Sequence, residues 1–213
     1  MITTVEVERF SLTSSRPFDK ILAAIKAAVG HPDMVKFAKT TAAARTFPQF
    51  ESTVREGLGK SGLMLFMELD HGSVIRKATG GDKPRMARLI MGNPLIMQQM
   101  ARHVPDAGSY APVTVLVDER SDGVHISYDR MVSLLAPNWN SDALALARDL
   151  DKKVETLCRK RQVEPTSLRR RCRAGKLRAA KVLKVQPSTV ARRSDDQSTA
   201  VGSFCQCPDS GGH

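Results

Sequence analysis

The sequence lacks the features that mark secreted, membrane-spanning and disulfide-bonded proteins. Its first 157 residues contain no cysteine, and the four cysteines come at or after that point: Cys158, Cys172, Cys205 and Cys207. No disulfide framework can therefore hold the first part of the chain. No apolar run approaches the roughly 20 residues that cross a bilayer, and Glu6 and Glu8 interrupt the N-terminal residues where a signal peptide needs an apolar run. These absences predict a cytoplasmic protein that does not enter a membrane.

Aromatic residues make up only 5% of the 213 residues, but hydrophobic residues make up 41%, which is enough to form a core. The formal net charge of +11 is unevenly distributed. Residues 1–158 contain 20 Lys and Arg against 18 Asp and Glu, whereas residues 159–213 contain 13 against 4. The basic character therefore belongs to the C-terminal segment, and the sequence divides into a near-neutral domain over 1–158 and a basic tail over 159–213.

The spacing of apolar residues predicts the elements of the first part of the chain. Alternating apolar and polar residues predict a strand over 2–12, and helical spacing predicts a helix over 17–29 that ends at a glycine. Two further helical stretches are expected over 33–47 and 50–58. They are interrupted by a proline, which breaks a helix.

The central part of the chain predicts strands separated by glycine-containing segments. Residues 63–69 are a short apolar run, which predicts a strand that is buried on both faces or packed under helices. The glycines in 72–83 predict a loop, and residues 85–91 predict another strand. A helix is expected over 94–104, because a proline stands at its first position and apolar residues follow at helical spacing.

A hairpin over 113–119 and 123–128 and a last helix over about 141–157 complete the domain. Strands in this order, with helices between them, favour an antiparallel sheet. The sequence therefore predicts the α+β class, with an antiparallel-containing sheet that has helices packed on one face.

Residues 85–135 combine two apolar strands, an amphipathic helix and a hairpin, with turn residues at Gly92-Asn93-Pro94, Pro105, Gly108 and Tyr110-Ala111-Pro112. This pattern resembles the bacterial domain-of-unknown-function 302 family, and the resemblance extends over about residues 1–158. It implies a compact α+β domain that pairs as a homodimer, and it supplies no catalytic residue. Many members carry a Pro-Cys-Asn step before the first hairpin strand. Here Val113 and Thr114 follow the proline, so chemistry linked to that cysteine is not implied.

Polar residues gather where the helix over 94–104 ends and the hairpin begins, which is a usual place for functional loops. If residues from the hairpin face them, a small-ligand pocket results. Its candidate ligand-binding residues are His103, Asp106, Ser109, Tyr110, His125, Tyr128 and Asp129. The alternative interpretation is a solvated hairpin face with Tyr128 in the core.

Catalytic and cofactor motifs are absent from the sequence. It contains no Gly-x-Ser-x-Gly elbow, and Gly80-Gly81-Asp82-Lys83 lacks the spacing of a phosphate-binding loop. The cysteine spacings match no zinc site. The sequence therefore predicts no metal, no cofactor and no catalytic residue, and a binding or interaction module is favoured. An enzyme that uses a polar cluster near His103, Asp106 and Asp129 is an alternative.

The tail over 159–213 has dense basic runs but no repeating apolar face, which predicts disorder and nonspecific attraction to polyanions. Part of it is weakly similar to helix-turn-helix segments of the excisionase type. The alternative function is therefore nucleic-acid binding through residues 159–193, with phosphate and base contacts from Arg169, Arg170, Arg171, Arg173, Lys176 and Arg178.

Overall fold

The structure is a computed structural model that describes residue 2 and residues 4–162. Residues 163–213 of the predicted basic tail, including its candidate nucleic-acid-binding residues, lie outside the described residues, whereas residues 159–162 are described and helical. Within the described part, the elements follow in the order β1 (Arg9–Ser14), α1 (Phe18–Lys26), α2 (Met34–Ala43), α3 (Phe47–Gly57), β2 (Met64–Asp70), α4 (His71–Thr79), β3 (Met86–Gly92), α5 (Pro94–Ala101), α6 (Ala107–Tyr110), β4 (Val113–Arg120), β5 (Gly123–Asp129), α7 (Met131–Leu135), a 3-10 turn (Ala136–Asn138) and α8 (Ser141–Gln162).

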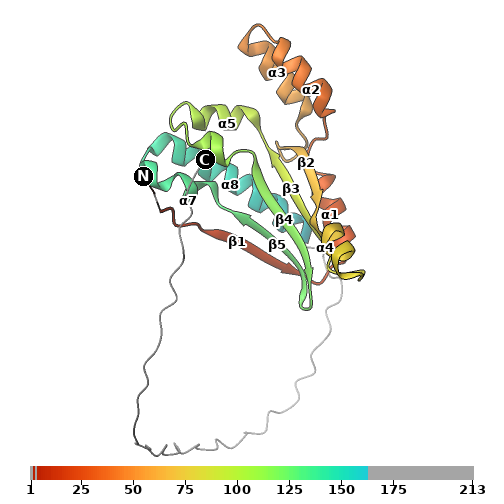
Figure 1. The fold of residues 1–213 in the computed structure, drawn as a ribbon. Helices are drawn as coiled ribbons and strands as arrows, with labels where there is room; N and C mark the ends of the chain where they lie inside the picture. The colour runs from red at the N-terminus through yellow and green to blue at the C-terminus, as the bar shows by residue number, and fades with distance from the viewer. Residues whose placement is uncertain (1, 3, 163–213) are drawn as a thin grey trace, which may run out of the picture. The chain divides into compact units, whose positions relative to one another are not determined.

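The five strands form one antiparallel sheet in the order β1-β5-β4-β3-β2 (Figure 1). The predicted hairpin is confirmed as β4 and β5, and the predicted strand over 85–91 is confirmed as β3. The α+β class is therefore confirmed, with a sheet in which every paired strand is antiparallel. No helix in the described part of the chain is both long enough and apolar enough to cross a membrane.

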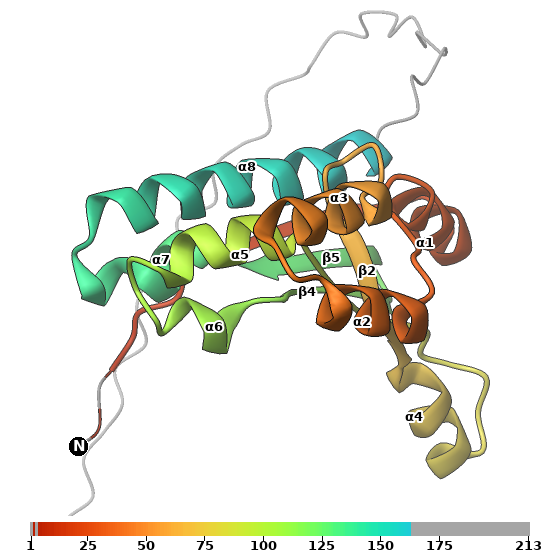
Figure 2. The same ribbon diagram turned by 90° about the horizontal axis from the view of Figure 1, so that it is seen from above.

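Helices α1, α5 and α8 lie on one face of the sheet, as predicted (Figures 1 and 2). Alternation along the strands turns Leu89, Val115 and Ile126 toward these helices, and all three are fully buried. Helix α8 buries a stripe at helical spacing against the same core, made by Ala143, Ala147, Leu150, Val154 and Leu157. Helices α2 and α3 form a hairpin beside the end of β2 and pack around a smaller cluster at Val54, Met64 and Leu95.

A buried carboxylate joins three elements of this core. Asp151 of α8 is only 1% exposed, and its Oδ1 accepts a hydrogen bond from the Tyr128 hydroxyl at 2.5 Å. The same carboxylate accepts from the backbone N–H groups of Met131 at 2.8 Å and Val132 at 3.1 Å, so it caps the N-terminus of α7. Burial raises the pKa of the Tyr128 hydroxyl, and the Asp151 charge raises it further, so the phenol stays protonated and donates. Burial also raises the pKa of Asp151, and these hydrogen bonds oppose that shift.

The prediction of a loop over 72–83 was wrong for most of its length. Residues His71–Thr79 form α4, whose N-terminus is capped by the Asp70 carboxylate, which accepts from the Ser73 N–H at 2.8 Å. Gly72 does not break this helix but allows it to approach the sheet, since a Cβ there would lie 2.6 Å from the Met86 nitrogen. The helix ends at Gly80, whose φ of 69° is the left-handed conformation that favours glycine.

Three other predictions need correction. The strand over 63–69 was expected to be buried on both faces or packed under helices, and burial on both faces is wrong, because β2 is an edge strand and Met67 is 52% exposed. The first strand begins at Arg9 and not near residue 2. The short helix α7 was not predicted, because its N-terminus is capped by Asp151, twenty residues away in the sequence.

Replacing Asp151 tests the importance of the buried carboxylate. We expect Asp151→Asn to lower the free energy of unfolding by ~3 kcal/mol, because the amide nitrogen cannot accept from the Val132 N–H and a buried donor loses its partner. Urea denaturation followed by circular dichroism measures the change. Asp149→Asn, an exposed substitution on the same helix, should change stability by less than ~0.5 kcal/mol. Equal losses in the two variants would contradict the assignment.

The cysteine within the described residues should be chemically inert in the folded protein. Cys158 is fully buried, and burial raises the pKa of its thiol to about 12, with a smaller contribution from the Glu155 charge. Since the thiolate is the reactive form, iodoacetamide at neutral pH should leave Cys158 unmodified in the native protein and alkylate it in urea. Peptide mass spectrometry resolves this site from the other cysteines. Alkylation at the same rate in both conditions would show that the site opens.

Candidate functional site

The face of the sheet opposite α1, α5 and α8 is a mixed polar and apolar surface. Alternation along the strands places on it Arg9, Ser11 and Thr13 of β1, Met67 and Leu69 of β2, Met86, Arg88 and Ile90 of β3, Thr114 and Leu116 of β4, and His125, Ser127 and Asp129 of β5. We refer to this surface as the open face. Antiparallel sheets commonly leave one face to solvent, but such faces are usually mainly polar.

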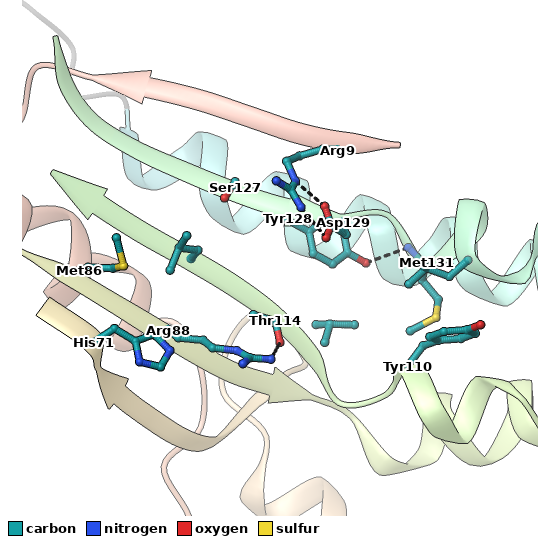
Figure 3. A pocket seen from close by; sticks show the side chains of 13 residues that line it. Arg9, His71, Met86, Arg88, Tyr110, Thr114, Ser127, Tyr128, Asp129 and Met131 are labelled. Carbon is teal, nitrogen blue, oxygen red and sulfur yellow. Dashed lines mark hydrogen bonds and ion pairs between the residues drawn. The ribbon is translucent and has the colours of Figure 1, made fainter. Parts of the chain in front are cut away.

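A pocket of about 470 Å³ lies on the open face (Figure 3). Its lining comes from strands β1, β3, β4 and β5, together with the first residue of α4 and parts of α6 and α7. The lining residues are Arg9, His71, Met86, Arg88, Tyr110, Val113, Thr114, Leu116, Ser127, Tyr128, Asp129, Met131 and Leu134. In Figure 3, Met86 and His71 stand at one end and Tyr110 and Met131 at the other.

An ion pair occupies one wall of the pocket. The Arg9 guanidinium donates two hydrogen bonds to the Asp129 carboxylate, with its Nε 2.6 Å and its Nη2 2.9 Å from the two carboxylate oxygens. The hydrogen bond to Asp129 and the charge of Asp129 raise the pKa of Arg9. Because the two charges neutralise each other, this wall adds little net charge to the pocket.

The second arginine of the pocket has a different environment. Arg88 projects from β3, and its guanidinium donates a hydrogen bond to the Thr114 hydroxyl on β4 at 3.2 Å. No acidic side chain among the described residues forms an ion pair with it. Its positive charge is therefore uncompensated within the pocket, and Figure 3 shows the guanidinium pointing toward Thr114 and away from His71.

The rest of the lining is mainly apolar. Met86 and Leu116 lie on the sheet beside Arg88, and Met131 and Leu134 come from α7. The Tyr110 ring closes the far end (Figure 3). The pocket therefore offers one uncompensated positive charge, hydroxyl groups at Thr114 and Ser127, and an apolar surface.

The structure brings three of the seven predicted ligand-binding residues to this pocket, namely Tyr110, Tyr128 and Asp129. Tyr128 is 2% exposed, and its hydroxyl donates a hydrogen bond to Asp151. Its side chain therefore lies in the core, as the alternative interpretation expected. His103 and Asp106 do not line the pocket. The nearest acidic partner of His103 is Asp142 of α8, at 4.0 Å.

The other two predicted residues also lie elsewhere. Ser109 is exposed on α6, and the Nε2 of His125 lies 2.8 Å from an oxygen of Asp122 at the turn of the hairpin. Neither residue lines the pocket. The proposed enzyme cluster is not assembled within the described residues, where no hydrogen bond or ion pair connects His103, Asp106 and Asp129. In the same part of the chain, no group of three or more His, Cys, Asp and Glu side chains is placed to hold a metal ion.

Sequence reasoning missed the two arginines and His71. The signal for Arg88 was present, since β3 alternates Ala87 and Leu89, which face the core, with a charged residue between them. On β1, Arg9 likewise stands next to Phe10, which faces the core, so alternation places Arg9 on the open face. The approach of His71 to the pocket could not be predicted, because it depends on the packing of α4 against β3.

The fold and the site define an α+β domain with one helix-covered sheet face and a pocket on the other. The sequence profile of the family described as "Domain of unknown function DUF302" matches residues 37–157, which is more than half of the chain. The chain therefore belongs to the DUF302 family, as the resemblance implied.

A solved structure has the same fold. The crystal structure of an uncharacterized conserved DUF302 protein from Bacillus stearothermophilus is similar to this chain with a TM-score of 0.51 and 12% sequence identity. The match covers 73% of this chain and 98% of that chain. No curated protein matches the sequence. The comparisons thus support the fold and the family, and the function has to be argued from the site.

Proposed function

We propose that this protein is a binding module that takes a small amphipathic anion in the pocket of the open face. The observation that carries the proposal is the Arg88 guanidinium, which has no acidic partner among the described residues and stands beside apolar Met86 and Leu116. A carboxylate or phosphate group would supply the missing partner. The apolar part of the same ligand would cover the exposed side chains.

The chemistry of the lining fits such a ligand. Guanidinium groups bind carboxylates and phosphates through parallel hydrogen bonds, and the bond from Arg88 to Thr114 restricts the arginine to one orientation. The volume of about 470 Å³ lies within the range of small-molecule sites. The Tyr110 ring offers an aromatic surface at the far end, so an aryl or branched alkyl group attached to the anion suits the pocket.

Binding is favoured over catalysis because the charged and hydroxyl side chains of the pocket form hydrogen bonds that orient them and do not activate a nucleophile. In the described pocket, the side-chain hydrogen bonds join Arg9 to Asp129 and Arg88 to Thr114, and the Tyr128 hydroxyl points to Asp151. None of these pairs joins a nucleophile to a general base. The groups orient charges, which is what a binding site requires.

Phenyl phosphate, which combines an anion with an aromatic ring, tests the proposal. In isothermal titration calorimetry, Arg88→Ala should weaken its binding at least about tenfold, because a charge-assisted hydrogen-bond pair is removed. Arg102→Ala removes an exposed arginine outside the pocket and should leave the affinity unchanged. Asp129→Asn should strengthen binding, since it releases the Arg9 charge. Equal affinities in the wild type and Arg88→Ala would refute the site.

We also propose that the chain forms a homodimer through the part of the open face that the pocket does not use. Met67 on the edge strand β2 is 52% exposed and lies opposite Ile90 of β3, with Leu69 on the same face. Exposed apolar side chains that adjoin one another mark interaction surfaces, and an uncovered edge strand invites pairing. A second copy of the chain, the occupant that the family resemblance implied, would cover this apolar area.

Light scattering coupled to size-exclusion chromatography tests the dimer. Met67→Lys should shift the protein to the monomer mass, because a charge would be buried in the interface. Val35→Lys places the same charge at a residue of α2 that is 67% exposed and should not change the mass. A wild-type protein that is monomeric at high concentration, or a Met67→Lys variant that stays dimeric, would exclude this interface.

Two further proposals rest on the sequence alone. Nucleic-acid binding through residues 159–193 rests on their basic composition, and the cytoplasmic location rests on residues 1–157, which contain no cysteine for a disulfide framework. Neither proposal depends on ligand binding by the residues that line the pocket of the open face. They are therefore independent of the proposed ligand site.

A further inference from the structure

A second concave surface lies on the helical side of the domain. It is a groove of about 580 Å³ between α8 and the loop at residues 58–62, close to Ala28 just after α1. Four lysines line it, Lys60 from the loop and Lys152, Lys153 and Lys160 from α8. We refer to this surface as the lysine groove.

The charge of the lysine groove is almost entirely positive. Its four lysines are exposed, and within the described residues none of them forms an ion pair or a side-chain hydrogen bond. Asp149 is the one acidic residue among those that line the groove. This arrangement contrasts with the rest of the domain, where residues 1–158 are close to neutral. The groove therefore concentrates an unusual share of uncompensated charge at one place.

The loop that carries Lys60 is held firmly against the end of α1. The Ser61 N–H donates to the Ala28 carbonyl at 3.0 Å, and the Gly59 N–H donates to the Leu63 carbonyl at 3.0 Å. Gly59 packs so closely that a Cβ there would lie 2.2 Å from the Val29 carbonyl carbon. The backbone that positions Lys60 across from α8 is thus fixed before any ligand binds, which lowers the entropic cost of binding.

The spacing of the lysines indicates the size of the anion. Lys152 and Lys160 are eight residues apart on one side of α8, which corresponds to about 12 Å along the helix axis. A single phosphate cannot contact both ends of such a row. In duplex DNA, each strand carries one phosphate per roughly 3.4 Å of axis, so three or four consecutive phosphates match this length.

We propose that the lysine groove binds the phosphate backbone of a nucleic acid without reading its sequence. Lysine contacts phosphate as a point charge, and neither an aromatic ring nor an arginine is among the residues that line the groove, so nothing there would stack on or select a base. Residues 163–213, which follow α8 in the sequence, contain ten Lys and Arg against four Asp and Glu and add attraction of the same sign. The phosphate-binding surface would therefore be a separate site from the pocket of the open face.

Fluorescence anisotropy of a short labelled DNA duplex, titrated with the full-length chain over a salt series, tests this site. The variant Lys60→Gln/Lys152→Gln/Lys153→Gln should bind at least about tenfold more weakly, and its log–log salt slope should fall by ~0.9 for each phosphate that the variant no longer neutralises. The matched control Lys20→Gln/Lys39→Gln/Lys77→Gln removes the same charge from exposed lysines on α1, α2 and α4. This control should bind clearly more tightly than the groove variant.

Further variants separate the groove from other sources of binding. Asp149→Asn should strengthen binding, because it removes the one carboxylate that opposes the phosphates. Equal reductions in affinity for the two triple-lysine variants would overturn the proposal, since net charge alone would then explain the binding. A reduction in affinity seen only in the variant Arg169→Gln/Arg170→Gln/Arg171→Gln would also overturn the proposal, because binding would then belong to the tail. Displacement of the DNA by polyglutamate at equal charge concentration would overturn it as well, because an acidic protein would then fit equally well.

Discussion

The buried carboxylate of Asp151 is the interaction on which the arrangement of this domain depends. It receives one hydrogen bond from β5 through Tyr128 and two from the backbone at the start of α7. A buried charge is tolerated only when its hydrogen-bonding capacity is filled, so these three groups have to meet in one geometry. That requirement fixes the register of α8 against the sheet and sets where α7 begins. The apolar contacts of α8 would tolerate a shift of the helix along the core, but such a shift would break the hydrogen bonds of the Asp151 carboxylate.

Both candidate sites follow from that register. With α7 held at Asp151, Met131 and Leu134 form a wall of the pocket on the open face. With the apolar stripe of α8 turned toward the sheet, Lys152, Lys153 and Lys160 are turned outward, where the loop at 58–62 places Lys60 beside them. One buried interaction thus positions an arginine pocket on one side of the sheet and a lysine groove on the helical side. The two surfaces differ in chemistry, because guanidinium beside apolar groups selects a small ligand whereas a row of ammonium groups suits an extended one.

The sequence predicted the elements whose signals are local. The hairpin of β4 and β5, the strand β3 and the helix α8 all have clear periodicity, and the short turn between β4 and β5 predicts their antiparallel pairing. Features that depend on distant partners could not be predicted in this way. The sequence predicts Gly72 in a loop, but it lies in α4, where the backbone of Met86 in β3 leaves no room for a side chain. That contact joins two separate elements and has no local signal in the sequence. His103 and His125 looked like site residues because histidine chemistry suits binding, yet each lies nearest to an acidic residue, Asp142 and Asp122. Arg88 was overlooked although its alternation with Ala87 and Leu89 indicated the face it occupies.

The residue that follows Pro112 bears on the chemistry proposed for the pocket. It is Val113, which is 4% exposed and contributes to the lining of the pocket. A thiol at this place would offer a nucleophile or a metal ligand, whereas valine offers only apolar contact. With that position apolar, and with Arg9 neutralised by Asp129, the specific polar recognition in the pocket falls to Arg88 and the Thr114 hydroxyl that orients it. This combination of one oriented guanidinium and apolar surface supports the proposal of reversible anion binding.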